Sequence, residues 1–195
     1  MTNKLFTLAG STAALAAVTV LGCSAATASA KPVSAKPTTV PATAPITAAH
    51  LTAYATDDGP TEQVILTGAV GDYGQAVSVN PDGSVDPEHN SQLELRLQHG
   101  TFRLDIAAID KAFVAAMAHR FPSDPATCSG SVAVTEHVPV VAGSGTGSYR
   151  GASGGFTLTI TLDEVDKPTA GRPCDGSAAF LSQTIVSTGP GELRF

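Results

Sequence analysis

The chain has 195 residues, of which 14% are charged and only 5% aromatic, and its formal net charge at pH 7 is −6. All seventeen acidic residues follow residue 50, where only eight basic residues remain, so this part of the chain carries the whole negative charge. The excess argues against nucleic-acid binding, because such proteins neutralise phosphates with clustered Lys and Arg. It also argues against direct adhesion to an anionic membrane.

Residues 1–22 predict a signal peptide, since a short basic start precedes an apolar run and small residues. A membrane-spanning helix fits less well, because the apolar run is followed by Ala, Ser, Thr and Pro and by no basic stop-transfer cluster. Two cleavage sites compete. Val20–Cys23 resembles the lipobox of bacterial lipoproteins, which predicts lipidation of Cys23 and an extracytoplasmic protein anchored in the cell membrane. Cleavage after Ala30 would instead give a secreted protein. We favour the lipobox.

Residues 23–50 predict a disordered tether. The segment is rich in Pro, Ala and Thr, with four prolines and few residues to bury. Pro-rich chains extend by roughly 3 Å per residue, so some 25 residues would hold a domain up to about 75 Å from a membrane.

Residues 51–195 have the usual size of a single domain with its own core. Their hydrophobic pattern mostly has a period of two, which predicts half-buried strands. In residues 156–163 every second residue is apolar, and the residues between them are Thr or Asp. Glu136 interrupts the apolar face of another such segment. Further strands are predicted within residues 62–70, 75–80, 92–98, 101–106, 131–141, 178–186 and 191–195.

The apolar face changes from odd to even positions between Leu97 and Phe102. A tight hairpin at His99–Gly100 would pair these two residues, but it would set Arg96 opposite Arg103, and directly opposed like charges are unfavourable. A bulge in one long strand would change the parity without this clash. The sequence leaves both open, and we favour the hairpin.

Residues 107–120 alone predict a helix, because apolar side chains recur at helical spacing and Pro122 follows. One short helix beside seven or eight strands predicts an all-β, mostly antiparallel fold, and we expect a single small β-barrel of about eight strands.

Residues 143–154 are dominated by glycine. We interpret them as a bend between tightly curved strands, because glycine permits positive φ values. A phosphate cradle would need a G-x-G-x-x-G register or a following Lys and helix, and neither is present. We expect Tyr149 to pack into the turn and Arg150 to stay solvated. The structural turn residues are Gly143, Gly145, Gly147, Tyr149, Gly151 and Gly154.

Other patterns point to no chemistry. Residues 151–155 spell G-x-S-x-G, but a hydrolase elbow lies between a strand and a helix, and His137, the last histidine, precedes this serine. Residues 80–88 alternate oxygen-bearing side chains, but the glycine stands too early for a calcium loop. We assign no catalytic residue, no cofactor and no metal site. The histidines without metal-ligand spacing are His50, His89, His99, His119 and His137.

Cys128 and Cys174 remain in the domain under either cleavage site. In an oxidising compartment two such cysteines form a disulfide. Closing the loop between them stabilises the fold by roughly 3 to 4 kcal/mol.

Residues 143–154 and the alternating strand after them resemble the G-T-G-x-Y-x-G-A-x-G turn of the allene oxide cyclase-like and dirigent-like barrels. The resemblance covers residues 131–166 well and the rest by strand count. It implies an eight-stranded antiparallel barrel whose lumen holds an apolar molecule. In that family, cyclisation depends largely on how the lumen folds a reactive oxide, and no position here matches the family's catalytic groups.

These observations favour a non-enzymatic binder of a small apolar or amphipathic ligand. The alternatives are a cyclase-like enzyme acting in the lumen and a structural or partner-binding envelope protein with a packed interior. A buried acid with a raised pKa would favour the enzyme. The expected contacts are a ligand in the barrel and the membrane through the lipid alone.

Overall fold

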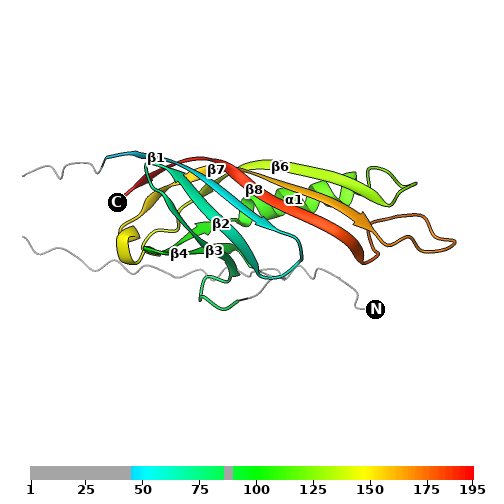
Figure 1. The fold of residues 1–195 in the computed structure, drawn as a ribbon, viewed down its shortest axis with the longest axis horizontal. Helices are drawn as coiled ribbons and strands as arrows, with labels where there is room; N and C mark the ends of the chain where they lie inside the picture. Colours follow the sequence, from blue (N-terminus) through cyan, green and yellow to red (C-terminus); the bar gives the residue numbers. More distant parts are fainter. Residues whose placement is uncertain (1–44, 86–89) are drawn as a thin grey trace, which may run out of the picture. The chain divides into compact units, whose positions relative to one another are not determined.

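The computed structural model describes residues 45–85 and 90–195, which form one curled sheet with a helix beside it (Figure 1). Cys23, the two cleavage sites and His89 lie outside the described residues. The elements are β1 (Thr47–Ala55), β2 (Thr61–Gly68), β3 (Asp72–Val79), β4 (Gln92–Leu97), β5 (Gly100–Asp105), α1 (Ala107–Arg120), β6 (Ser129–Pro139), the 3-10 turn η1 (Gly147–Tyr149), β7 (Ser153–Asp166) and β8 (Phe180–Arg194).

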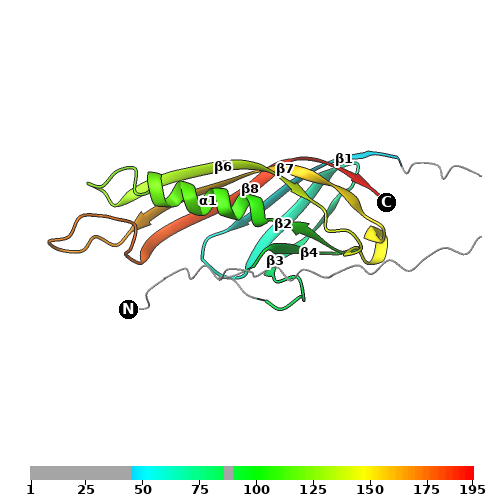
Figure 2. The ribbon, with the colours of Figure 1, turned by 180° about the vertical axis from the view of Figure 1, so that it is seen from behind.

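The eight strands form a single sheet in the order β5-β4-β3-β2-β1-β8-β7-β6, and each neighbouring pair is antiparallel. The predicted all-β fold with one short helix is therefore confirmed, and the sheet curls into a half-barrel (Figure 2). Since β1 lies between β2 and β8, the first and last strands of the chain are paired at the centre of the sheet.

The two edges of the sheet meet at one end, which we name the closed end. There the segment after β6 crosses to β5: the Val141 N–H donates to the Arg103 carbonyl at 2.8 Å, and the Thr146 N–H donates to the Thr101 carbonyl at 2.8 Å. Away from the closed end, α1 lies along β6 (Figure 2), and the longer strands β6, β7 and β8 extend to the distal end.

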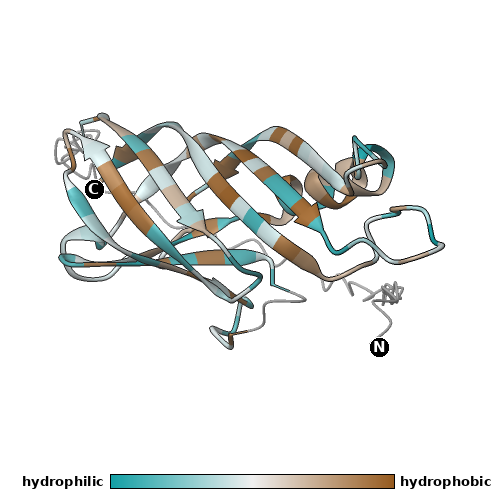
Figure 3. Cartoon of the chain, turned by 45° about the vertical axis from the view of Figure 1, so that its right-hand side comes forward, coloured by the Kyte–Doolittle hydropathy of each residue, from teal (hydrophilic) through white to brown (hydrophobic). Residues whose placement is uncertain are grey.

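Residues of high and low hydropathy alternate along much of the strands (Figure 3), and the buried positions define an inner face of the sheet. Phe156, Leu158 and Leu162 are buried on the inner face of β7, as the sequence predicts. The core also contains Leu51, Leu66, Leu95, Phe102 and Leu104 from the other strands. The inner face near the closed end is thus filled by the chain's own side chains, as is common in small barrels.

β1 is the strand that the sequence did not reveal. It begins at Thr47, so its first residues belong to the segment that we expected to be a tether. Its inner face is formed mainly by Ala49, Ala53 and Ala55, which are small enough for the sheet to curl tightly around them. Alanine has little hydrophobicity and low strand propensity, and this explains why the period of two was missed.

β8 is one strand, although the sequence suggested two. The pairing with β7 shifts register between Val165 and Asp166, then runs to Thr159 opposite Thr188 and resumes at Phe156 opposite Gly191. Pro190 lies in the interruption. Proline has no backbone N–H, and at this point β8 needs none for a hydrogen bond to β7. A Cβ on Gly191 would meet the Phe156 ring and the Gly155 carbonyl, so the break allows the two strands to pack closely.

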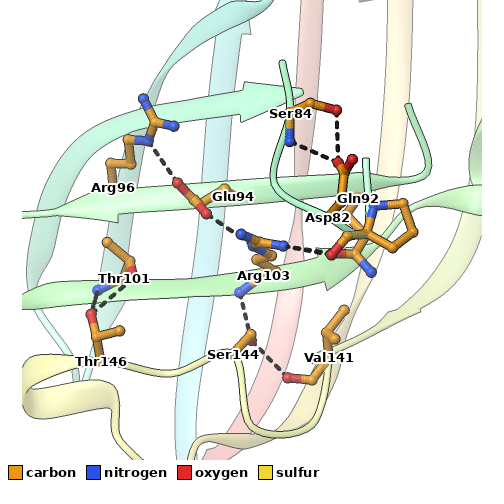
Figure 4. Close-up of polar contacts among 11 residues, drawn as sticks. Asp82, Ser84, Gln92, Glu94, Arg96, Thr101, Arg103, Val141, Ser144 and Thr146 are labelled. Atoms are coloured by element: carbon orange, nitrogen blue, oxygen red, sulfur yellow. Dashed lines mark hydrogen bonds and ion pairs between the residues drawn. The ribbon is translucent and has the colours of Figure 1, made fainter. Parts of the chain in front are cut away.

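The segment from β4 to β5 is a hairpin, as favoured, but its register differs from the expected one by two residues. Leu97 lies opposite Gly100, and Leu95 lies opposite Phe102. Arg103 therefore faces Glu94 and not another arginine, with Arg103 Nε 2.9 Å from Glu94 Oε2 (Figure 4). An attractive cross-strand pair replaces the expected clash, which removes the objection to a hairpin.

Candidate functional site

The predicted disulfide is confirmed, with 5.1 Å between the Cα atoms of Cys128 and Cys174. It joins the start of β6 to the loop between β7 and β8 at the distal end. The bond therefore ties together the segments that leave and enter the three long strands.

The glycine-rich segment crosses from β6 to β5 at the closed end. Gly147 has a φ of +57° and approaches the His99 carbonyl so closely that a Cβ would collide with it. Tyr149 is buried and Arg150 is exposed. Ser153 is exposed at the start of β7. The loop therefore offers no α-helix N-terminus as an anion site. The same crossing contains the predicted turn residues Gly143, Gly145, Gly151 and Gly154.

The Asn80–Ser84 turn is closed by its own hydrogen bonds. The Gly83 N–H donates to the Asn80 carbonyl at 2.8 Å, and the Ser84 N–H and hydroxyl both donate to Asp82. Over residues 45–85 and 90–195 no three acidic, histidine or cysteine side chains gather as metal ligands. His50, His119 and His137 are exposed.

A buried carboxylate organises the closed end. Asp72 Oδ2 accepts a hydrogen bond from the Tyr149 hydroxyl at 2.6 Å and lies 3.0 Å from His99 Nδ1. The backbone N–H groups of Tyr73, Gln98 and His99 donate to the same carboxylate at 2.8, 3.2 and 3.2 Å. Asp72 therefore joins β3, the β4–β5 turn and the glycine-rich crossing.

The hydrogen bonds decide the protonation of this cluster. Burial by itself raises the pKa of Asp72, but the bonds from Tyr149, Tyr73 and His99 outweigh burial and lower the pKa to about 2. Burial and the Asp72 carboxylate together raise the pKa of the Tyr149 phenol. A permanently ionised, fully engaged carboxylate stabilises structure and has no proton to exchange near neutral pH.

Two other acidic residues, Glu62 and Asp110, also have shifted pKa values. Glu62 shares the inner face of β2 with Val64 and Leu66 and stands opposite Ala76 of β3. Its Oε2 atom is buried without a hydrogen-bond partner. Burial, followed by the charge of Asp110 in the first turn of α1, raises the pKa of Glu62 to about 7.

Burial raises the pKa of Asp110 to about 6. Two carboxyls from elements far apart in the sequence thus exchange protons near neutral pH, which is the property of a general acid or base. The sequence analysis missed both residues. The signal for Glu62 was present, since its position has the same parity as Val64 and Leu66.

This acidic pair predicts a pH-dependent stability. The folded pKa of Glu62 lies above its ordinary 4.5, so folding holds a proton that the unfolded chain releases. The contribution of Glu62 to the free energy of unfolding is complete below pH 4.5. It decreases by about 3 kcal/mol as the pH rises through 7. Urea unfolding from pH 4.5 to 8 should show this loss together with a contribution from Asp110, and Glu62→Gln should remove the part that belongs to Glu62. Glu192→Gln, at an exposed position of β8, should leave it unchanged.

Two hollows of the described residues lie next to β6. One, of about 480 Å³, runs between α1 and β6. Small apolar side chains, Ala112, Ala115 and Val134 among them, line it together with the polar side chains of Thr135, His119, Arg120 and Glu136. We name it the α1–β6 groove. Glu136, which interrupts the apolar face in the sequence, lines this groove.

The second hollow, of about 460 Å³, lies at the distal end over β6, β7 and β8. Serine and threonine hydroxyls and Asp163 line it, and Val165 is its one large apolar residue. No helix of the described residues is long and apolar enough to cross a membrane.

No family model, curated protein or solved structure matches this chain. The relation to the allene oxide cyclase-like and dirigent-like barrels stays a prediction from the sequence pattern.

Proposed function

We propose that this protein is a non-enzymatic binding module of the bacterial cell envelope, anchored through Cys23, which holds a small amphipathic molecule in the α1–β6 groove. The observation that carries the proposal is the groove itself, because 480 Å³ is within the usual size range of ligand sites. Its apolar alanine and valine lining suits a hydrocarbon body, and its His119, Arg120 and Glu136 side chains suit a polar head.

The packing of the rest of the interior supports this choice of site. Near the closed end Leu51, Leu95 and Phe102 are fully buried against each other, so the curled sheet is filled there. Val134 and Ile160 pack against this core and stay partly exposed. Apolar surface therefore remains available next to α1, where Phe113 and Met117 are also only partly buried.

Ligand binding is tested by mass spectrometry of the solvent extract of full-length Cys23→Ala protein purified from the medium. We expect one amphipathic compound in near-stoichiometric amount. Ala115→Trp fills the groove from its exposed wall and should reduce the compound several-fold, whereas Ala118→Trp, also exposed on α1 but outside the groove, should not. An extract no different from the blank, or equal loss in both variants, contradicts the proposal.

Anchoring has a separate test. Cys23→Ala removes the thiol that the lipobox would lipidate, so the variant should pass from the membrane fraction to the medium. Lys4→Ala is a control that leaves the cysteine in place, and the lipidated product should remain with the membrane. Continued membrane association of Cys23→Ala would contradict lipid anchoring.

The Glu62 and Asp110 pair favours a second candidate, a cyclase-like enzyme acting on the inner face. A carboxyl with a pKa of about 7 can donate and accept a proton at neutral pH. If the extracted compound is converted to an isomer by the protein, Glu62→Gln should slow that conversion at least a hundredfold, as expected for loss of a general acid or base. Binding without conversion supports the non-enzymatic module.

A further inference from the structure

The outer face of the half-barrel is almost free of charge. Outward-facing positions of β1, β2, β3, β6, β7 and β8 hold no Asp, Glu, Lys or Arg between Glu192 near the closed end and Asp163 near the distal end. On the other side the uncharged region ends at Arg96, whose neighbour across the strands is Gln75. We name this region the neutral face.

The contrast within the same sheet shows that the absence of charge is local. Beyond Arg96, the outer face of the β4–β5 hairpin carries the ion pairs of Glu94 with Arg96 and Arg103 (Figure 4). About a quarter to a third of an ordinary soluble surface is charged, so a region spanning six strands without such a residue is unusual. The neutral face belongs to a domain that has more than twice as many acidic as basic residues.

Hydroxyl groups are arranged in register across the neutral face. Thr135, Thr159, Thr188 and Thr52 stand opposite one another on β6, β7, β8 and β1. The Thr135 and Thr159 hydroxyls are 2.8 Å apart, and those of Thr52 and Thr188 are 3.1 Å apart. Each hydroxyl can donate one bond and accept two, so this row keeps capacity for further partners.

The same row continues into apolar side chains that face solvent. Thr52 is opposite Ile65, and Ile65 is opposite Tyr73. Ile65 is 49% exposed, Tyr73 is 62% exposed, and Tyr54 beside them is 48% exposed. Large apolar groups gathered on one exposed face commonly mark an interaction site. The third tyrosine of the chain, Tyr149, is buried in the core.

The distal hollow adjoins the neutral face. Its residues Ser131, Asp163 and Thr184 form one cross-strand row, which is the next outward row after Ala133, Thr161 and Val186 of the neutral face. A surface of hydroxyls and phenol rings is thus continuous with a hollow of about 460 Å³ that is lined by hydroxyls, the Gln183 amide and the two acidic residues Asp163 and Glu164.

We propose that the neutral face binds an uncharged polysaccharide chain. Sugar hydroxyls donate and accept hydrogen bonds, as do the threonine hydroxyls and the Gln63 and Gln75 amides, while the exposed tyrosine rings offer flat apolar surfaces to the C–H faces of sugar rings. The face holds His50 and His137 but no Asp, Glu, Lys or Arg, so binding desolvates no carboxylate, ammonium or guanidinium group. An acidic partner would be repelled by the domain, and a basic one would find no carboxylate within the face.

The test is affinity electrophoresis of full-length Cys23→Ala protein in native gels that contain dextran, mannan, arabinogalactan or hydroxyethylcellulose, all uncharged. We expect at least one polymer to retard the protein. Tyr54→Ala/Tyr73→Ala should weaken the apparent affinity for that polymer about tenfold, from the loss of two ring contacts. The matched control Val85→Ala/Val114→Ala removes two exposed apolar side chains elsewhere and should bind like the parent protein.

Every other result overturns the proposal. These results are no retardation by any of the four polymers, equal retardation of the tyrosine double variant, or a dimer in sedimentation that the tyrosine variant dissociates, which would make the face a contact between two copies. The α1–β6 groove shares Ala133 and Thr135 with the neutral face, but Ala115 lies on α1, so Ala115→Trp should leave the tyrosine-dependent polymer binding unchanged.

Discussion

Replacing Cys128 and Cys174 together by serine should lower the free energy of unfolding by about 4 kcal/mol. The two residues are 46 positions apart in the sequence, so the bond closes a long loop and removes many conformations from the unfolded chain. It also fixes the start of β6 against the β7–β8 loop at the distal end.

Urea unfolding with and without a reducing agent measures this effect. Reduction should lower the urea concentration at which the parent protein is half unfolded. It should leave that concentration unchanged for the double serine variant. A midpoint insensitive to reduction in the parent protein, with both thiols shown to be free, would contradict the prediction. The Cys23→Ala background removes the remaining thiol from the comparison.

Asp72→Ala should be as destabilising, again by about 4 kcal/mol, because it leaves the buried Tyr149 hydroxyl and several partly buried N–H groups without an acceptor. The Tyr149 hydroxyl and the His99 and Gln98 N–H groups all donate to this carboxylate. Asp82→Ala is the matched control: it removes an exposed carboxylate that also accepts bonds within a turn, and it should cost about 1 kcal/mol or less. Equal effects would contradict the role assigned to Asp72.

The same carboxylate predicts acid sensitivity. The folded pKa of Asp72, about 2, is below its ordinary 3.8, so its contribution is complete above pH 4 and is lost as pH falls toward 2. Asp72→Asn should remove this part of the pH dependence. The window is separate from that of Glu62, which lies between pH 4.5 and 7 and has the opposite sign. Chemical denaturation across both windows distinguishes the two groups.

The period of two along the chain predicted most of the sheet, because exposed and buried faces alternate wherever large apolar residues occupy one side. Residues 156–163 and residues 107–120 were predicted with the correct type of structure. The pattern fails at β1, where alanines form the inner face. It also fails at Pro190. The proline predicts the end of a strand, but in the structure only the pairing of β8 with β7 is interrupted there.

The register of the β4–β5 hairpin could not be read from the turn alone. A shift of two residues keeps every side chain on its own face, so burial does not distinguish the two registers. The charges do, since only the observed one pairs Glu94 with Arg103. The effect of the Asp110 charge on Glu62 depends on how α1 packs against the sheet, and no local pattern contains that information.

The pairing of β1 with β8 also determines when this protein can fold. Thr47 lies opposite Leu193, so the centre of the sheet joins the two extremes of the domain. Neither β1 nor β2 can bury its inner face in the native way until almost the last residue has been synthesised. Contacts of such long sequence separation form slowly. The sheet can therefore be completed only after β8 has been synthesised and has paired with β1.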